Sequence, residues 1–339
     1  MKITSLLFFT FLALWVGISC TNKPKEQKIF PGEIWNDSKG VPINAHGGGI
    51  LYHAGKYYWF GEYKKGKTWR VGYLSNWECY RCEAGGVSCY SSENLFNWKF
   101  EGIALKPNGS DPANDLHISK VLERPKVIYN EQTKKFVMWF HVDSEDYSYA
   151  RAGVAVSDNP QGPYTFHESV RPNNQMSRDM TLFKDDNGKA YHIFSSENNA
   201  VMHISLLTDD DLRPSGIEKR IFIGKSREAP AMFKHNGKYF LITSACSGWA
   251  PNAAMVATAD TVLGEWKERY NPCKGPKSDS TFIAQSTYVL PVEGKTDQYI
   301  FMADRWNKTN LEDSRYIWLP LLFKNDSIAI NWKDSWDLN

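Results

Sequence analysis

The stretch Ala231-Met-Phe-Lys-His-Asn-Gly-Lys-Tyr239 decides the fold. It is typical of a β-hairpin, because apolar residues flank a turn that contains glycine. Four other stretches repeat its order of an apolar strand, a polar turn and a second strand that opens with an aromatic residue. They are residues 49–57, 126–136, 180–191 and 287–299. A unit that recurs five times predicts a fold built from repeats.

The aromatic residues that open the second strands give the length of the repeat. They are Tyr57, Phe136, Tyr191, Tyr239 and Tyr299, and they lie 79, 55, 48 and 60 residues apart. No long amphipathic helix is evident between them, and further strands are predicted at residues 87–91, 153–157, 202–205 and 255–258. Such periods are typical of propeller blades, whereas a β-sandwich does not require one hairpin five times. We therefore predict an all-β fold, a five-bladed β-propeller.

Composition and charge agree with one large globular domain. The 339 residues are 42% hydrophobic and 23% charged, with 40 Lys+Arg against 38 Asp+Glu. A formal net charge of +2 provides no strong basic field to hold a polyanion. Nucleic acid is therefore not an expected partner.

The N-terminus predicts export. Lys2 precedes an apolar run at residues 6–18 that is too short to span a bilayer comfortably, and Ser19 and Cys20 follow. Cys20 resembles a bacterial lipoprotein attachment site, with simple secretion as the alternative. We predict a signal peptide at 1–19, a lipoprotein tether at 20–30 and the propeller at 31–339. The tether has no acidic tag after Cys20, which favours a membrane-anchored protein that faces the periplasm.

The cysteines give little sign of a metal site. They are Cys20, Cys79, Cys82, Cys89, Cys246 and Cys273. The spacing of Cys79, Cys82 and Cys89 suggests zinc, but a structural zinc site needs a fourth ligand, and the chain has no second CxxC or nearby HxxxH. We predict no metal and no cofactor, and expect ordinary loop cysteines or one disulfide.

The residues just before the five inner strands are the candidate functional residues. The first strand of each propeller blade lines the central channel, so the preceding residue lies at a rim where all blades converge. Aligned on the aromatic landmarks, these rim residues are His46, Glu123, Asp179, Glu228 and Gln285. Three are carboxylates. We expect all five to be neighbours around one axis.

Crowded carboxylates raise one another's pKa, and adjacent arginines lower it. Arg124, Arg178 and Arg227 each adjoin one rim acid in sequence. Glycoside hydrolysis uses such a mixture, with one carboxyl protonated and another charged. A single acid at a strand start is more often a solvated turn residue, so the recurrence at five positions carries the prediction. Pro125 and Pro230 are expected to keep the chain extended and to fix the direction of the acids.

The aromatic content of 14%, with 13 tryptophans, fits a sugar site, because pyranose faces stack on indole rings. Candidates predicted outside the strands are Trp69, Trp77, Trp249 and Trp306. Each alone is more often a packing residue. Trp249 is the best candidate, because Gly248 and Pro251 flank it in a loop.

Several motifs together resemble glycoside hydrolase family 43, and more narrowly its exo-β-1,3-galactanase (galactan 1,3-β-galactosidase) branch. They are Asn44-Ala-His-Gly-Gly-Gly-Ile-Leu-Tyr52, Tyr58-Trp-Phe-Gly-Glu62, Val87-Ser-Cys-Tyr-Ser-Ser92, Glu123-Arg-Pro-Lys-Val-Ile-Tyr-Asn130, Ser177-Arg-Asp-Met-Thr-Leu-Phe183, Arg227-Glu-Ala-Pro-Ala-Met-Phe233 and Gly248-Trp-Ala-Pro-Asn252. The resemblance implies an inverting five-bladed propeller enzyme that releases galactose from β-1,3-galactan, the backbone of arabinogalactan. The propeller would be its catalytic domain.

The resemblance also assigns roles to the rim residues. Glu228 matches the general acid, and Asp179 matches the carboxylate that orients the sugar and tunes the acid. Most of the wider family has an aspartate base where this chain has His46. The galactanase branch lacks that aspartate and is thought to use a glutamine in its imidic acid form, which Gln285 matches. Glu123 would bind the galactose and is the alternative base, since a neutral amide is a poor base.

By the same matching, Glu62, Tyr147 and Ser247 would contact the terminal galactose. Ser247 stands where the branch more often has threonine. Trp249 and His46 complete the predicted substrate-binding residues. Two other hypotheses stay open: another family 43 activity, such as an arabinofuranosidase or xylosidase, and a non-catalytic sugar-binding propeller that has lost its base.

Overall fold

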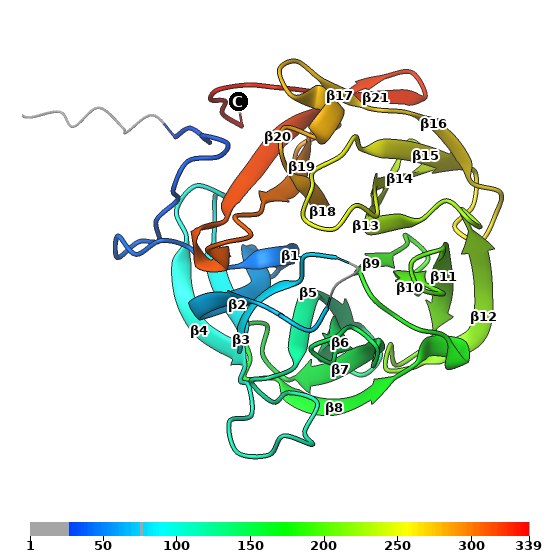
Figure 1. Cartoon of the computed structure of the whole chain (residues 1–339). Helices are drawn as coiled ribbons and strands as arrows, with labels where there is room; N and C mark the ends of the chain where they lie inside the picture. The colour runs from blue at the N-terminus through cyan, green and yellow to red at the C-terminus, as the bar shows by residue number, and fades with distance from the viewer. Residues whose placement is uncertain (1–26, 75–76, 339) are drawn as a thin grey trace, which may run out of the picture.

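The computed structural model describes residues 27–74 and 77–338. Their strands form five antiparallel blades around a central axis, as Figure 1 shows, so the predicted five-bladed β-propeller is confirmed. The predicted signal peptide and Cys20 lie outside the described residues. In the described part of the chain, no helix is both long and apolar enough to cross a bilayer.

Each blade runs outward from the axis in chain order. Blade 1 contains β1 (His46–His53), β2 (Lys56–Arg70), β3 (Tyr80–Ser92) and β4 (Lys99–Leu105). Blade 2 contains β5 (Val121–Asn130), β6 (Lys135–Asp143), β7 (Arg151–Ser157) and β8 (Thr165–Val170). Blade 3 contains β9 (Met180–Lys184), β10 (Ala190–Ser196), β11 (Val201–Leu207) and β12 (Pro214–Ile221).

Blades 4 and 5 complete the ring. Blade 4 contains β13 (Arg227–His235), β14 (Lys238–Ala245), β15 (Met255–Ala259) and β16 (Lys267–Tyr270). Blade 5 contains β18 (Gln285–Pro291), β19 (Tyr299–Arg305), β20 (Arg315–Lys324) and β21 (Ser327–Asn331), with the short β17 (Cys273–Lys274) parallel to β21 at its outer edge. Three short 3-10 turns are η1 (Pro172–Asn174), η2 (Ser278–Ser280) and η3 (Leu311–Asp313).

The five predicted hairpins form the two inner strands of each blade. The landmark aromatics pair with the ends of the inner strands, for example Tyr57 with Tyr52 and Phe136 with Tyr129. The inner strands β1, β5, β9, β13 and β18 pack against one another in that order, and β18 returns to β1. The predicted rim residues therefore lie at one end of a single channel.

The ring is closed by aromatic packing between the last blade and the first. Trp59 of β2 contacts Trp318 of β20, with ring centroids 4.8 Å apart, and both side chains are almost fully buried. Ile29 and Trp336 exchange two backbone hydrogen bonds of 2.8 and 3.1 Å. Ile29 is buried, although it falls within the range predicted as a tether. The folded part therefore begins before residue 31.

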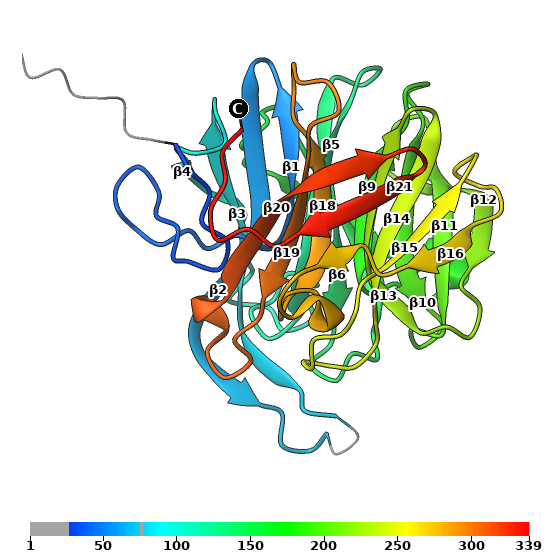
Figure 2. The same cartoon turned by 90° about the horizontal axis from the view of Figure 1, so that it is seen from above.

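One hairpin projects beyond the ring. His46, at the start of β1, pairs with Glu62 in β2, so the rest of β2 extends past the rim. Figure 2 shows the β2–β3 hairpin projecting from one face of the propeller. Trp69 was predicted outside the strands, but it lies in this extension of β2. The β2–β3 extension places Trp69 and Trp77 on the face where the inner strands begin.

The described cysteines form no disulfide. Cys79, Cys82, Cys89 and Cys273 are buried thiols, and Cys246 is exposed. The cysteines of residues 27–74 and 77–338 are therefore free thiols, but they are not all loop residues as expected, because Cys82 and Cys89 lie in β3 and Cys273 lies in β17.

Candidate active site

The same backbone feature, a β-bulge, sets the direction of three of the rim side chains. The pairing of β1, β5 and β13 is interrupted by a bulge directly after His46, Glu123 and Glu228. The next residue in each strand has a positive φ: 60° at Gly47, 56° at Arg124 and 53° at Ala229. A β-bulge bends its strand and redirects the adjacent side chain. The bulges therefore turn the rim residues relative to the regular pleat.

This geometry corrects the role expected for the two prolines. A residue before proline prefers the extended region, so Pro125 and Pro230 predicted an extended chain at Arg124 and Ala229. Both residues are instead left-handed. Such a conformation is unfavourable by about 1 kcal/mol or more for a residue other than glycine, so the surrounding contacts must hold it in place. Arg124 has such contacts on its side chain, its amide and its carbonyl.

Glu228 is a buried carboxyl that stays protonated at neutral pH. Its Oε1 accepts a 2.9 Å hydrogen bond from Gln285 Nε2, and only 9% of the residue is exposed. Burial and the negative charge of Asp179 raise its pKa to about 8. A protonated carboxylic acid at pH 7 is the group that a general acid requires.

Arg124 connects two further rim residues, Asp179 and Gln285. Its Nη2 lies 2.9 Å from Asp179 Oδ2 and donates to Gln285 Oε1 at 2.5 Å, while Nη1 donates to the Ser286 carbonyl at 2.8 Å. Asp179 Oδ2 also accepts from the Ala229 amide at 3.1 Å. One guanidinium thus fixes both the carboxylate and the amide that flank Glu228.

The arginines do not pair with their sequence neighbours. Arg124 follows Glu123 but forms its ion pair with Asp179 of the next blade. Arg178 donates to the carbonyl of Tyr147, and Arg227 donates to Thr243. The arginines therefore form no ion pairs with the adjacent acids, although Arg124 and Arg227 still interact electrostatically with Glu123 and Glu228.

Glu123 is the charged acid of the rim. Its Oε1 accepts a 2.9 Å hydrogen bond from Tyr147 Oη, and its Oε2 lies 3.3 Å from His141 Nδ1. Lys64 Nζ is 3.9 Å away. Burial opposes ionisation, but His141 and Lys64 outweigh it and hold the pKa of Glu123 below its usual range. Glu123 and Glu228 therefore have opposite protonation states, as the pattern of the rim predicted.

Glu62 lies beside Glu123 and is held by two donors. Its Oε1 accepts from the Arg124 amide at 3.0 Å, and its Oε2 lies 2.6 Å from Lys64 Nζ. Gly47 makes room for it, because a Cβ there would lie 2.1 Å from Glu62 Oε1. Burial raises the pKa of Glu62, although Lys64 opposes the effect.

The partners Lys64 and His141 were missed by sequence reasoning. Lys64 stands two residues after Glu62 in β2, a spacing that places both side chains on one face and could have identified it. His141 pairs across the β5–β6 ladder with Glu123. That contact depends on the register of the hairpin beyond the bulge after Glu123, and the bulge was not predicted from the sequence.

His46 lies beneath the rim rather than on it. Its ring is fully buried and stacks on Tyr316, with centroids 5.1 Å apart, and its Nδ1 lies 3.3 Å from Asp304 Oδ1. Asp304 also accepts from the Gly47 amide at 2.8 Å. The predicted contact between His46 and a substrate is therefore corrected: the histidine has no exposed surface and supports the first bulge from below.

Aromatic side chains border the acids. Trp306 Nε1 donates to Gln285 Oε1 at 3.3 Å, and its ring meets Trp249 edge to face at 6.1 Å. Trp77 meets Tyr147 at 5.4 Å in the same way. The predicted Trp249 thus lies at the edge of the acid cluster, and Trp77 and Trp306 join it there.

Ser247 lies on the loop that carries Trp249 and is exposed. Its Oγ donates to the Ala250 carbonyl at 2.6 Å and accepts from Asn252 Nδ2 at 2.6 Å. Asn252 also bonds both backbone groups of Ala245. These bonds fix the loop at the end of β14, so its hydroxyl and indole have defined positions next to the rim.

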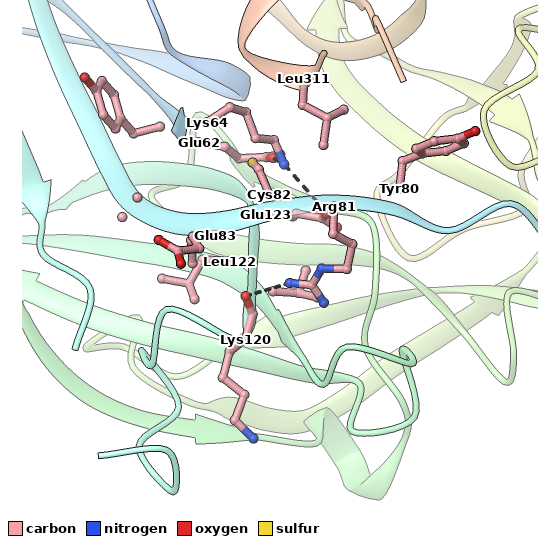
Figure 3. A pocket seen from close by; sticks show the side chains of 15 residues that line it. Glu62, Lys64, Tyr80, Arg81, Cys82, Glu83, Lys120, Leu122, Glu123 and Leu311 are labelled. Carbon is pink, nitrogen blue, oxygen red and sulfur yellow. Dashed lines mark hydrogen bonds and ion pairs between the residues drawn. The ribbon is translucent and has the colours of Figure 1, made fainter. Parts of the chain in front are cut away.

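A small cavity lies behind the carboxylates. It has a volume of about 20 Å³ and is lined by residues of β2, β3 and β5, including Glu62, Arg81 and Glu123. Figure 3 shows these side chains, with the contact from Lys64 to Glu123 and the hydrogen bond from Arg81 to the Lys120 carbonyl. A volume of this order holds about one water molecule. It is too small for a molecule the size of a monosaccharide.

One group among the described residues has metal-ligand geometry. The side-chain ligand atoms of Glu123, His141 and Asp179 lie within 4.8 Å of one another. Two cations, Lys64 and Arg124, already contact the two carboxylates. Burial opposes protonation of His141, but Asp143 and Glu123 raise its pKa to about 9, so a metal ion would have to displace a proton from this ring.

Comparison with known proteins identifies the family. Residues 73–310 match glycosyl hydrolases family 43. The chain belongs to this family. The comparison with curated proteins gives no match.

Solved structures of family 43 enzymes share the fold and much of the sequence. One is a β-1,3-galactosidase with 43% identity and a TM-score of 0.86, over 93% of this chain and 64% of that one. A second β-1,3-galactosidase, with galactodeoxynojirimycin, has 44% identity and a TM-score of 0.84, over 91% of this chain and 100% of that one. An exo-β-1,3-galactanase from Phanerochaete chrysosporium, with β-1,3-galactotriose, has 36% identity and a TM-score of 0.82, over 93% of this chain and 69% of that one. This chain thus spans less than two thirds of the first relative and all of the second.

Proposed function

We propose that this family 43 protein is an inverting exo-glycosidase that releases galactose from the ends of β-1,3-galactan. The observation that carries the proposal is the buried Glu228, whose raised pKa keeps it protonated beside Asp179 and Gln285. Such a protonated carboxyl is the general acid that glycoside cleavage requires. The choice of sugar is supported by the relatives, which are β-1,3-galactosidases and exo-β-1,3-galactanases.

In this mechanism Glu228 donates its proton to the glycosidic oxygen while the bond breaks. Gln285 Nε2 donates to Oε1 of Glu228, which leaves Oε2 to carry the proton of the acid. Asp179 opposes ionisation of Glu228 until the leaving oxygen needs the proton. Glu123, Glu62, Tyr147 and Ser247 would bind hydroxyl groups of the terminal galactose.

The attacking water is assigned to Gln285, whose imidic acid form would accept the proton that the water loses as its oxygen bonds to the anomeric carbon. All four hydrogen-bonding positions of its amide are occupied: Nε2 donates to Glu228 and to Ser244 Oγ, and Oε1 accepts from Arg124 and Trp306. The contact with Trp306 is the longest, at 3.3 Å, so it is the one that water would replace. Glu123 is a poor base, because its lowered pKa makes it reluctant to accept a proton.

The first experiment is digestion of β-1,3-galactotriose by the purified protein, followed by proton NMR. Stepwise release of galactose that appears first as the α-anomer is the expected result, because an inverting enzyme converts a β-linkage to an α-product. No release of galactose, or release of the β-anomer first, would overturn the proposal. A panel of nitrophenyl arabinofuranoside and xyloside tests the other activities known in the family, which the relatives do not favour.

Kinetics of two variants test the assignment of the water. Gln285→Ala should lower kcat with little change in KM, whereas Glu123→Gln should mainly raise KM. The opposite result, with kcat lost in Glu123→Gln at unchanged KM, would make Glu123 the base.

We also propose that the protein is exported, is lipid-anchored at Cys20 and faces the periplasm. The support is the sequence of the N-terminus, with its short apolar run before Ser19 and Cys20. Labelled palmitate should be incorporated by the full-length protein and not by a Cys20→Ser variant. Equal labelling of both would refute the anchor, and accessibility of the anchored protein to protease in intact cells would refute the periplasmic orientation.

A further inference from the structure

A second cavity opens at the other end of the central channel. Its volume is about 660 Å³, and residues of all five inner strands line it. The rim acids stand at the starts of these strands, whereas this cavity is lined by their later residues and by the hairpin turns. It therefore faces away from the candidate active site. Its volume falls within the range of small-molecule sites, about 300 to 1,000 Å³.

A ring of equivalent residues surrounds the mouth of this cavity. Directly opposite the five landmark aromatics in the strand ladders stand Tyr52, Tyr129, Phe183, Lys234 and Pro291. All five line the cavity. Tyr52 is 38% exposed and therefore accessible to a ligand. Aromatic faces together with a proline ring form the kind of surface on which the C–H face of a pyranose packs.

The floor of the cavity is polar. Lys126 is buried, and its Nζ donates to the carbonyls of Gly47 at 2.9 Å and Arg124 at 3.4 Å. The hydroxyl of Tyr288 makes no hydrogen bond within the described part of the chain, and burial alone raises its pKa to about 12. Both side chains approach Gly49, where a Cβ would lie 2.6 Å from Lys126 Cδ and 3.3 Å from Tyr288 Cδ2. A ligand hydroxyl is a suitable partner for this floor.

The charges around the cavity are mixed. Lys126, Lys184 and Lys234 are accompanied by several carboxylates, including Asp185 and Asp186. Lys234 Nζ lies 2.9 Å from both aspartates, so its charge is compensated. Neither sign dominates, which disfavours a phosphate or a polyanion. A neutral ligand rich in hydroxyl groups fits the polar floor and the aromatic mouth.

We propose that this cavity is a second carbohydrate site, which binds neutral pyranose units of a galactan chain without cleaving them. The choice of galactan rests on the proposed function, whereas the site itself rests on the cavity. Binding of polysaccharide at this end would keep the protein attached to its substrate while the rim acts on chain ends.

In the test, β-1,3-galactotriose is titrated into the Glu228→Gln protein, which keeps the ligand intact. Binding is measured by calorimetry and NMR. Two sites are expected. Tyr52→Ala should weaken one of them about tenfold through lost stacking. Tyr288→Phe, which keeps the ring, should weaken the same site about fivefold through a lost hydrogen bond.

Phe30→Ala is the matched control, because Phe30 is exposed and does not line the cavity. It should leave both sites unchanged. In the wild-type background, Tyr52→Ala and Tyr288→Phe should keep kcat and KM for galactobiose. A single binding site, or a second site insensitive to both tyrosine variants, would overturn the proposal. The wild-type hydrolysis assay is separate, so failure of the proposed function would be recognised independently.

Discussion

At the residue scale, the chemistry depends on the proton that Glu228 retains. We predict that Glu228→Gln lowers kcat/KM for β-1,3-galactotriose by about 10² to 10⁴, since general acid catalysis contributes that much. The loss should be far smaller for dinitrophenyl β-galactoside, because its leaving group departs without a proton. Initial rates with both substrates check the prediction. Glu265→Gln, a change at an exposed glutamate of blade 4, is the control. Equal losses on both substrates would show that Glu228 acts in some other way.

The raised pKa of Glu228 also sets the pH dependence. The acid must be protonated, and its pKa is about 8, so kcat/KM for galactotriose should be retained at pH 7 and fall about tenfold per pH unit above 8. Glu123 has a lowered pKa and stays charged at pH 5, so no loss is expected there from its protonation. A profile of kcat/KM from pH 5 to 10 measures the loss above pH 8 and its absence at pH 5. A descending limb near pH 5 would contradict the assignment.

The same shift predicts a cost in stability. The unfolded carboxyl loses its proton near pH 4.5, whereas folded Glu228 keeps it up to about pH 8. Between these values the unfolded state binds fewer protons, so wild-type stability should fall relative to Glu228→Gln as pH rises. Thermal melts of both proteins at pH 5 and pH 8 test this. A difference between them that is independent of pH would contradict the shifted pKa.

Sequence reasoning found the rim acids but not what tunes them. Glu123, Asp179, Glu228 and Gln285 could be predicted because each precedes a recognisable inner strand. Their partners come from other strands: Lys64 from β2 and His141 from β6. The contact of Lys64 with Glu123 depends on how the first two blades pack, and that of His141 depends on the bulge that shifts the β5–β6 register.

At the element scale, the bulge at the start of β1 allows a test of how the backbone makes room for Glu62. Gly47 has a φ of 60°, and a Cβ there would lie 2.1 Å from Glu62 Oε1. We predict that Gly47→Ala destabilises the protein and raises KM for galactotriose, because Glu62 must move away from the Arg124 amide. Gly55→Ala is a matched control, since its φ is 82° but nothing lies within 4 Å of its Cβ. Gly55→Ala should lose about 1 to 2 kcal/mol of stability, because alanine adopts a positive φ less readily than glycine, and it should keep its KM.

Denaturant melts and steady-state kinetics distinguish the two glycine variants. If both lose the same stability and neither changes KM, the contact between Gly47 and Glu62 has no role in the site.

The strands of the structure also indicate which elements can be predicted from the sequence. The five hairpins were found because turn and strand patterns are local. The two-residue β17, which pairs with the distant β21, has no such pattern.

At the scale of the whole molecule, the channel exists only while the ring is closed. The fifth blade has to pack against the first, and no covalent bond among the described residues joins them. The closure relies on Trp59 and Trp318 and on the chain ends, where Trp336 Nε1 donates to the Trp318 carbonyl at 2.8 Å. Repeat length predicted the number of blades, but the closure joins residues that are far apart in the sequence, such as Trp59 with Trp318 and Ile29 with Trp336, and could not be read from any local pattern.

Trp336→Ala tests this closure. Trp336 is 6% exposed and pairs with Ile29, so its loss should remove about 3 to 5 kcal/mol of stability, as for other large buried aromatics. Trp332→Ala is the matched control, because Trp332 packs within blade 5 against Phe282 and is only half-buried. Calorimetric melts should show a larger decrease in Tm for Trp336→Ala. Because the Gly47 amide at the rim of the first blade donates to Asp304 of the last blade, galactotriose hydrolysis should also fail at a lower temperature in that variant. Equal decreases in Tm for the two tryptophan variants would mean that the ring is held closed by the inner strands alone.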